Sequence, residues 1–233
     1  LLSLPASDPP LEVDADLRPE GRNGPLVRSF KAYAAYYEKW SAVWEAQALL
    51  RARPVVGDQE LCTRFAQLID PLRWPEGGMS EAEVREIRRI KARVDSERLP
   101  RGADPTTHLK LGRGGLADVE WTVQLLQLQH AHAAPGLRTP RTLEALAAAA
   151  DAELLSAEDS ETLAAAWRIV SRIRNAIVML RAKPAESLVQ QADERAGVAH
   201  LLGYGLEGGE RMVDDYLRTT RHARQVVERV FWE

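Results

Sequence analysis

The sequence predicts a mainly α-helical protein, built as a helical bundle with one remnant strand. Apolar residues recur at three- and four-residue steps in six or seven segments, which is the period of a helix face. Capping residues and prolines mark where most of these segments begin and end. Only Leu11 to Leu17 alternates apolar with acidic residues at the period of a strand. The sequence therefore predicts one strand and no partner strands with which it could form a sheet.

The predicted strand carries the first candidate site. Asp14 and Asp16 lie two residues apart and therefore on one face, opposite the apolar side chains. A breaker-rich loop follows at once and contains Arg18 and Arg22. Two carboxylates followed by two arginines could bind a metal and an anionic ligand. The alternative, which the pattern by itself favours, is an edge strand with a solvated acidic face.

The first part of the chain is expected to hold two helices. Ser29 is a good N-cap for a long helix that ends before Pro54. Asp58 caps a second helix, which Pro71 should stop. The segment 70–79 is rich in Pro and Gly and is the best domain boundary in the chain.

The second part is expected to be entirely helical. Ser80 and Glu83 form a capping box, and the helix that follows should run to about Arg98 with Lys91 on its apolar face beside Ile87. Further helices are expected from Leu116, and at about 140–150, 157–183, 193–202 and 207–231.

A glycine-rich turn precedes the central helix and is the second candidate site. Lys110, Gly112, Arg113, Gly114 and Gly115 fall within six residues. Glycines leave backbone N–H groups unshielded where a helix presents its free donors, so the turn could hold a phosphate. Spacing alone favours a plain turn before a core helix. The turn is not a P-loop, because its lysine precedes the glycines and no Lys-Ser or Lys-Thr follows them.

Composition and residue spacing give no support for a nucleic-acid or membrane partner, an internal disulfide or a histidine metal site. Lys and Arg number 31 against 34 Asp and Glu, a net charge of -3, which gives no reason to expect a nucleic acid or a membrane. The single cysteine, Cys62, excludes an internal disulfide and suits a reducing cytoplasm. The histidines show no metal-ligand spacing. The opening LLSLPASDPP has neither Met nor a basic signal start, which indicates a truncated beginning.

Several specific motifs follow one another along nearly the whole chain. They are Val13-Asp14-Ala15-Asp16-Leu17-Arg18-Pro19-Glu20-Gly21, Gly24-Pro25-Leu26-Val27, Trp44-Glu45-Ala46-Gln47-Ala48-Leu49, Arg51-Ala52-Arg53, Ile90-Lys91-Ala92-Arg93, and Lys110 through Trp121. In their order and spacing the chain resembles the bacterial bifunctional glutamine-synthetase adenylyltransferases, which also remove the adenylyl group.

The resemblance implies a fold and a division into domains. Residues 1–70 would be the C-terminal part of an α/β nucleotidyltransferase domain, and residues 80–233 its helical bundle domain, at the C-terminal end of the family's longer chain. Only the third catalytic carboxylate of the family is matched, at Asp14. Asp16 lies where the family more often has another residue, and the family's Gly-Ser turn and Asp-X-Asp pair are absent from this sequence.

The resemblance also implies a reaction: transfer of AMP from ATP to a tyrosine of glutamine synthetase, and its removal by phosphorolysis, which regulates nitrogen assimilation. Asp14 would share a Mg²⁺ ion that activates the nucleophile. Arg18 would meet a phosphate or brace the strand, and Lys110 and Arg113 would contact nucleotide or a domain interface. A nitrogen-regulatory signal protein is a further expected partner. The fragment by itself should be inactive.

A second function is left open by the sequence. The missing Asp pair is compatible with a non-catalytic helical module that binds a regulatory partner protein or a metabolite. An upstream Gly-Ser turn with an Asp-X-Asp pair would decide for catalysis.

Overall fold

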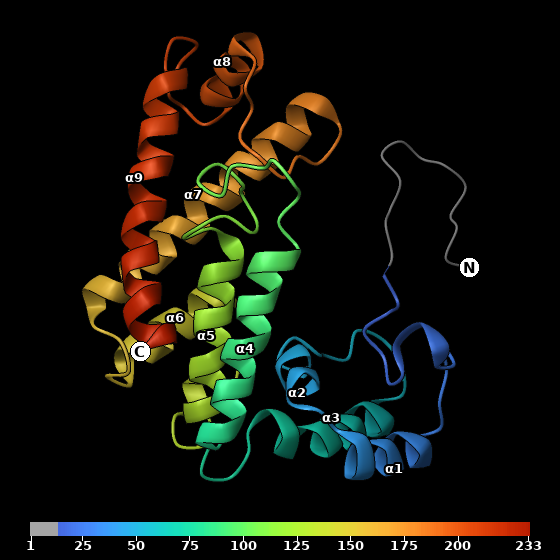
Figure 1. Ribbon diagram of the computed structural model, residues 1–233. Coiled ribbons are helices and arrows are strands. Elements are labelled where there is room, and N and C mark those ends of the chain that lie inside the picture. The colour runs from blue at the N-terminus through green and yellow to red at the C-terminus, as the bar shows by residue number, and fades with distance from the viewer. Residues whose placement is uncertain (1–13) are drawn as a thin grey trace.

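The computed structural model describes residues 14–233, and these residues form helices joined by turns and loops (Figure 1). No strand forms among them; their one β pairing is an isolated bridge between His108 and Ser187. The mainly α prediction is therefore confirmed. The helices are α1 (Phe30–Trp40), α2 (Val43–Leu49), α3 (Gln59–Arg73), α4 (Glu81–Glu97), α5 (Leu116–His130), α6 (Thr142–Asp151), α7 (Ala157–Arg181), α8 (Ala192–Leu201) and α9 (Gly209–Val227), with short helical turns η1 (Gly21–Asn23), η2 (Pro135–Leu137) and η3 (Glu228–Trp232).

The helices form a small group and a larger bundle. In Figure 1, α1, α2 and α3 lie together beside the lower end of α4, whereas α4 to α9 build an elongated bundle. Helix α2 joins the two, since it contacts α3 on one side and α4 and α5 on the other. No helix among residues 14–233 is both long and apolar enough to cross a membrane.

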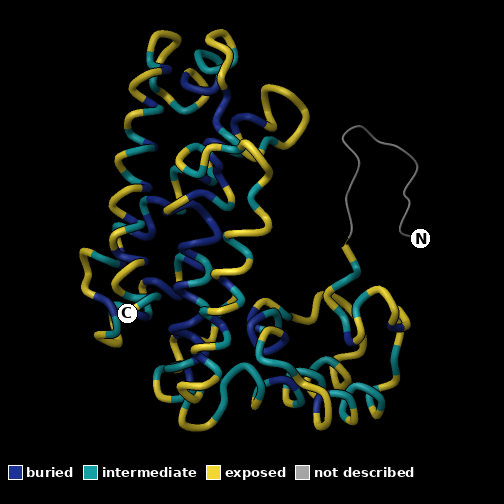
Figure 2. Tube along the Cα trace, in the orientation of Figure 1, coloured by how far each residue is buried: buried dark blue, intermediate teal, exposed yellow. Residues whose placement is uncertain are grey.

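Two apolar cores fill the bundle. The first lies among α4, α5, α6, the start of α7 and the end of α9, and it takes in Leu50 next to α2. The second lies among the rest of α7, α8 and the start of α9, where Tyr216 and Met212 are fully buried. Figure 2 shows this burial running through the bundle, while α1 to α3 are mostly half-buried or exposed. The bundle is thus the stable part of the described structure.

The predicted strand is not found where the structure can test it. Leu11, Glu12 and Val13 lie outside the described residues, and residues 14–17 form no strand. A strand is stable only when it pairs with others, and residues 14–233 offer none. Instead the Asp14 carboxylate accepts the backbone N–H of Asp16 (N···O 2.8 Å), a local bond that competes with strand pairing.

The predicted long helix after Ser29 is wrong in its extent. Ser29 does cap it, but α1 ends at Trp40 and the separate helix α2 follows. The buried Glu45 carboxylate accepts the backbone N–H of Ala42 (3.0 Å) and the Tyr36 hydroxyl (2.8 Å). These bonds hold the second helix at a new angle, and no proline or glycine signals the break.

Other helix ends follow their caps more closely than their prolines. The capping box of Ser80 with Glu83 is confirmed, and α7 begins at the expected residue 157, where Ser156 caps it. Pro71 does not stop α3, which continues through it to Arg73. Helix α6, expected at about 140–150, begins slightly later, at Thr142.

The glycine turn brings two backbones into contact. Gly114 has a φ of +68°, and a Cβ there would lie 1.9 Å from the carbonyl oxygen of Thr220 in α9. No side chain fits at that distance, so glycine allows the turn to pack directly against α9. Gly112 is similarly crowded, with its Cβ position 2.1 Å from the carbonyl oxygen of His108.

Replacing Gly114 by Ala should therefore cost far more than an ordinary glycine substitution. The matched control is Gly102→Ala, since Gly102 has a similar φ of +83° but open space around its Cβ position. Urea unfolding should give a loss of about 1 kcal/mol for the control, the backbone strain alone. Gly114→Ala adds overpacking against α9 and should lose at least about 2–3 kcal/mol. Equal losses would show that α9 moves aside freely.

Candidate functional site

The two carboxylates of the N-terminal loop have different surroundings. Asp16 forms an ion pair with Arg22 (Oδ2 to Nε 2.6 Å) and lies 3.8 Å from a guanidinium nitrogen of Arg18. Asp14 is exposed and contacts no cation among residues 14–233. Of the two, only Asp14 keeps an uncompensated carboxylate, which is the property a metal ligand needs.

Arg18 is held by the loop that contains it. Its Nε and Nη2 donate to the carbonyl oxygen of Gly24 at 3.1 and 3.0 Å, and Nη1 donates to the carbonyl of Ala15. The side chain is only 15% exposed. Most of its donors are therefore occupied, and these contacts are those of a brace that closes the 15–24 loop.

The backbone N–H groups of the glycine turn donate hydrogen bonds within the turn and to α5. The plain turn that spacing favoured agrees with the structure, because the turn and the first carboxylate of α5 accept the N–H groups of residues 114–117. Lys110 and Arg113 are exposed on its surface, and neither has an ion-pair partner in the described part of the chain. The bonds run from the N–H of Gly114 to Asp118 Oδ2 (2.8 Å), and from those of Gly115, Leu116 and Ala117 to the carbonyls of Gly112, Leu109 and Lys110 (2.9, 3.2 and 2.9 Å).

The predicted site residues do not meet in one place. Figure 1 shows the loop that follows residue 14 next to α1 to α3, whereas the turn that leads into α5 lies at the opposite, upper end of α4. A role for Lys110 or Arg113 in contacting nucleotide or another domain stays a prediction, and it would be separate from that of Asp14.

A buried ionic cluster joins three helices of the bundle. Lys91 of α4 donates from Nζ to both carboxylate oxygens of Asp95 (2.6 and 2.7 Å) and to Asp118 Oδ1 of α5 (2.7 Å). The other oxygen of Asp118 accepts from Arg224 Nη1 of α9 (2.9 Å) and from the Gly114 N–H. The Lys91 and Asp118 side chains are 1% and 3% exposed. Two cations facing two carboxylates leave no net charge, which makes their burial tolerable.

The titration of the cluster reflects burial set against pairing. Burial raises the pKa of Asp95, and the Lys91 ammonium offsets that only in part. Burial lowers the pKa of Arg224, but the carboxylates of Asp118 and Glu228 outweigh it and raise that pKa overall. All of these groups already have hydrogen-bonded partners, so the cluster fixes helices and offers no free acid or base.

Sequence reasoning missed this cluster but recorded its signal. Lys91 falls on the apolar stripe of α4 with Val84 and Ile87, and a lysine on a buried face requires a buried acid. Periodicity could not show that the acid would be Asp118. Nor could it show that Asp118 would bind Arg224, which lies 106 residues further along the sequence. Among residues 14–233, no three His, Cys, Asp or Glu side chains gather as a metal site.

Comparison with known proteins identifies the family. Residues 1–68 match the model of glutamate-ammonia ligase adenylyltransferase, and residues 87–232 match that of GlnD PII-uridylyltransferase. The curated relatives include bifunctional glutamine synthetase adenylyltransferase/adenylyl-removing enzymes of Streptomyces coelicolor (58% identical over 232 residues), Nocardia farcinica (59% over 232) and Mycobacterium tuberculosis (57% over 231). The alignments cover 100%, 99% and 99% of this chain. The chain belongs to the glutamine-synthetase adenylyltransferase family.

The two family models divide the candidate residues between them. Asp14 and Arg18 fall in the adenylyltransferase model, while the buried cluster falls wholly in the uridylyltransferase model, to whose family the bundle also belongs. The chain spans 23% of the length of these adenylyltransferase relatives.

The buried cluster predicts a large effect of Asp118→Asn on folding stability. The change removes the carboxylate that Lys91 and Arg224 share and leaves each cation a single acid, Asp95 or Glu228, which should cost about 3 kcal/mol, the low end for a broken buried pair. The control is Glu86→Gln, which breaks an exposed pair with Arg89 on the same α4 helix and should cost little. Chemical unfolding of both variants measures the difference. Similar losses would mean that the cluster does not hold α4 to α5.

Proposed function

We propose that this chain is part of an adenylyltransferase that transfers AMP from ATP to a tyrosine of glutamine synthetase, and in its longer form also removes it by phosphorolysis. The observation that carries the proposal is 56–59% identity, over 99–100% of the chain, to proteins that bear this name. The relatives support this catalytic role over that of a non-catalytic binding module.

Asp14 is the chain's contribution to the reacting centre in this proposal. Phosphoryl-type transfer depends on neutralising charge on the triphosphate, which Mg²⁺ supplies when carboxylates hold it. The uncompensated Asp14 carboxylate fits one such ligand, but one carboxylate does not make a magnesium site. The remaining ligands would come from residues outside this sequence. Arg18 supports the reaction by holding the loop that carries Asp14 closed.

The proposal also includes a division into domains, the protein partners and a cellular location. Residues 1–70 end the nucleotidyltransferase domain and residues 80–233 form the helical domain; the change of family model between residues 68 and 87 supports this division. Glutamine synthetase is the protein substrate, and a nitrogen-regulatory signal protein is a further partner. A cytoplasmic location fits a chain with one unpaired cysteine, Cys62.

The test compares Asp14→Asn with Asp16→Asn in the longer protein. The first change keeps the volume but removes the charge, and it should lower transfer of radiolabelled AMP to glutamine synthetase by at least about 100-fold. Because Asp14 is exposed, its unfolding midpoint should hardly move. Asp16→Asn should cost less activity, since Asp16 is already paired with Arg22. Near-normal transfer by Asp14→Asn, or AMP transfer by the 233-residue chain alone, would refute the assignment.

A further inference from the structure

A groove of about 670 Å³ runs between α2, α4 and α5. Each helix gives it one face: residues 44, 47, 48 and 51 of α2 and its end, residues 86, 90, 93 and 94 of α4, and residues 121 and 124 of α5. These spacings of three and four residues put each set on a single side of its helix. The groove is therefore built by the packing of regular elements and is large enough for a nucleotide.

The inside of the groove is apolar and contains two indoles. Trp44 and Trp121 line it together with Ile90 and Val94. Trp44 is 46% exposed, so part of its indole is open to a ligand, and covering it would be favourable. Neither indole stacks on another aromatic ring in the described part of the chain. Trp121 packs in part against the first apolar core, so the exposed indole of Trp44 is the main surface on which a planar base can stack.

The rim of the groove is positively charged. Four arginines line it, against a single glutamate: Arg51, Arg89, Arg93 and Arg98, with Glu86. Three of them pair at 2.8–3.9 Å with carboxylates whose side chains are 28–64% exposed, and Arg98 has no ion-pair partner among residues 14–233. Exposed ion pairs of this kind contribute little, so a polyphosphate can replace these carboxylates.

The groove also lies next to the loop of Asp14. Leu17 lines it, three residues after Asp14 and next to Arg18. Its walls come from both family-model regions, α2 from the first and α4 and α5 from the second. A ligand in this groove would thus reach from the bundle to the loop that carries the candidate carboxylate.

We propose that this groove binds the nucleotide substrate, ATP, with the adenine against Trp44 and Trp121 and the phosphates on the arginines of the rim. The inference rests on the proposed function for the identity of the nucleotide. It assigns to the helical part of the chain a binding role beyond that of Asp14. An acidic peptide would match the arginines but would leave the exposed indole of Trp44 unexplained, so the observations favour a nucleotide.

The experiment is a ligand-observed NMR titration of the 233-residue chain with ATP, followed at the adenine H2 and H8 protons, with inorganic triphosphate as a competitor. Saturable binding is expected. Trp44→Leu should weaken ATP binding about five-fold or more, the lower range for one stacked base, and leave binding of triphosphate unchanged. Arg93→Gln should weaken both ligands, because it acts on the phosphates.

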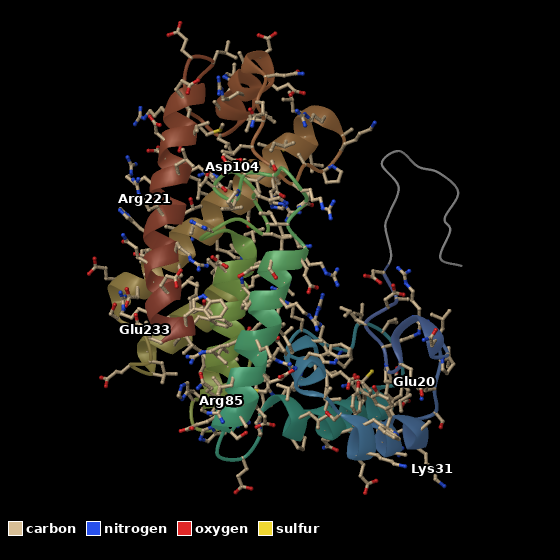
Figure 3. The ribbon with its side chains drawn as sticks, in the orientation of Figure 1. Glu20, Lys31, Arg85, Asp104, Arg221 and Glu233 are labelled. Atoms are coloured by element: carbon tan, nitrogen blue, oxygen red, sulfur yellow. The ribbon has the colours of Figure 1, made fainter. Side chains whose placement is uncertain are left out.

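Two matched variants control for general effects. Trp40 is 63% exposed at the end of α1 and Arg85 lies at the lower end of α4 (Figure 3); neither lines the groove. Trp40→Leu and Arg85→Gln should bind ATP as the unchanged chain does. Equal effects of Trp40→Leu and Trp44→Leu, or no saturable ATP binding, would overturn the proposal and leave the groove to another partner.

The groove and the reaction can fail separately. In the longer protein, Trp44→Leu should raise the KM for ATP in AMP transfer to glutamine synthetase. If this variant transfers AMP with an unchanged KM for ATP, the groove does not bind the substrate, but the proposed function is still supported. If the chain binds ATP with the expected pattern but the longer protein transfers no AMP, ATP binding in the groove is supported and the proposed reaction is refuted.

Discussion

The contact between Lys91 and Asp118 is the constraint on which the rest of this structure depends. It fixes α4 against α5, and through the second oxygen of Asp118 it also fixes α9 and the glycine turn. A buried charge without its partner is so costly that the three helices can take only the arrangement in which all four groups meet. The position of α4 against α5 in turn sets two walls of the arginine-rimmed groove.

The glycine turn illustrates how one motif allows two interpretations, of which the plain turn that spacing favoured agrees with the structure. Glycines before a helix are typical of phosphate cradles, but here the N–H groups of Gly114 to Ala117 already donate to carbonyls or to the Asp118 carboxylate. The glycines are needed for packing, because only hydrogen fits between Gly114 and the Thr220 carbonyl. The same residues therefore serve the ionic cluster and the close approach of α9, both of which are structural.

What sequence could predict here was local. Caps at Ser29 and Ser80 depend on a side chain and a backbone N–H three residues on, and both were predicted. The break before α2 depends on hydrogen bonds from Ala42 and Tyr36 to the Glu45 carboxylate. No proline or glycine lies there, so nothing in the sequence indicates the break. Partners such as Asp118 and Arg224 depend on tertiary packing, so a single sequence shows that Lys91 needs an acid without showing which.

That unforeseen break has a consequence for the candidate ligand site. In one continuous helix, Trp40 and Trp44 would be a single turn apart and would share a face. Because the chain changes direction at Ser41 and Ala42, Trp40 stays at the end of α1 while Trp44 turns with α2 into the groove. The buried Glu45, bonded on both sides of the break, holds that change of direction. Glu45 thus positions the indole of Trp44 and Arg51, which line the groove, without lining the groove itself.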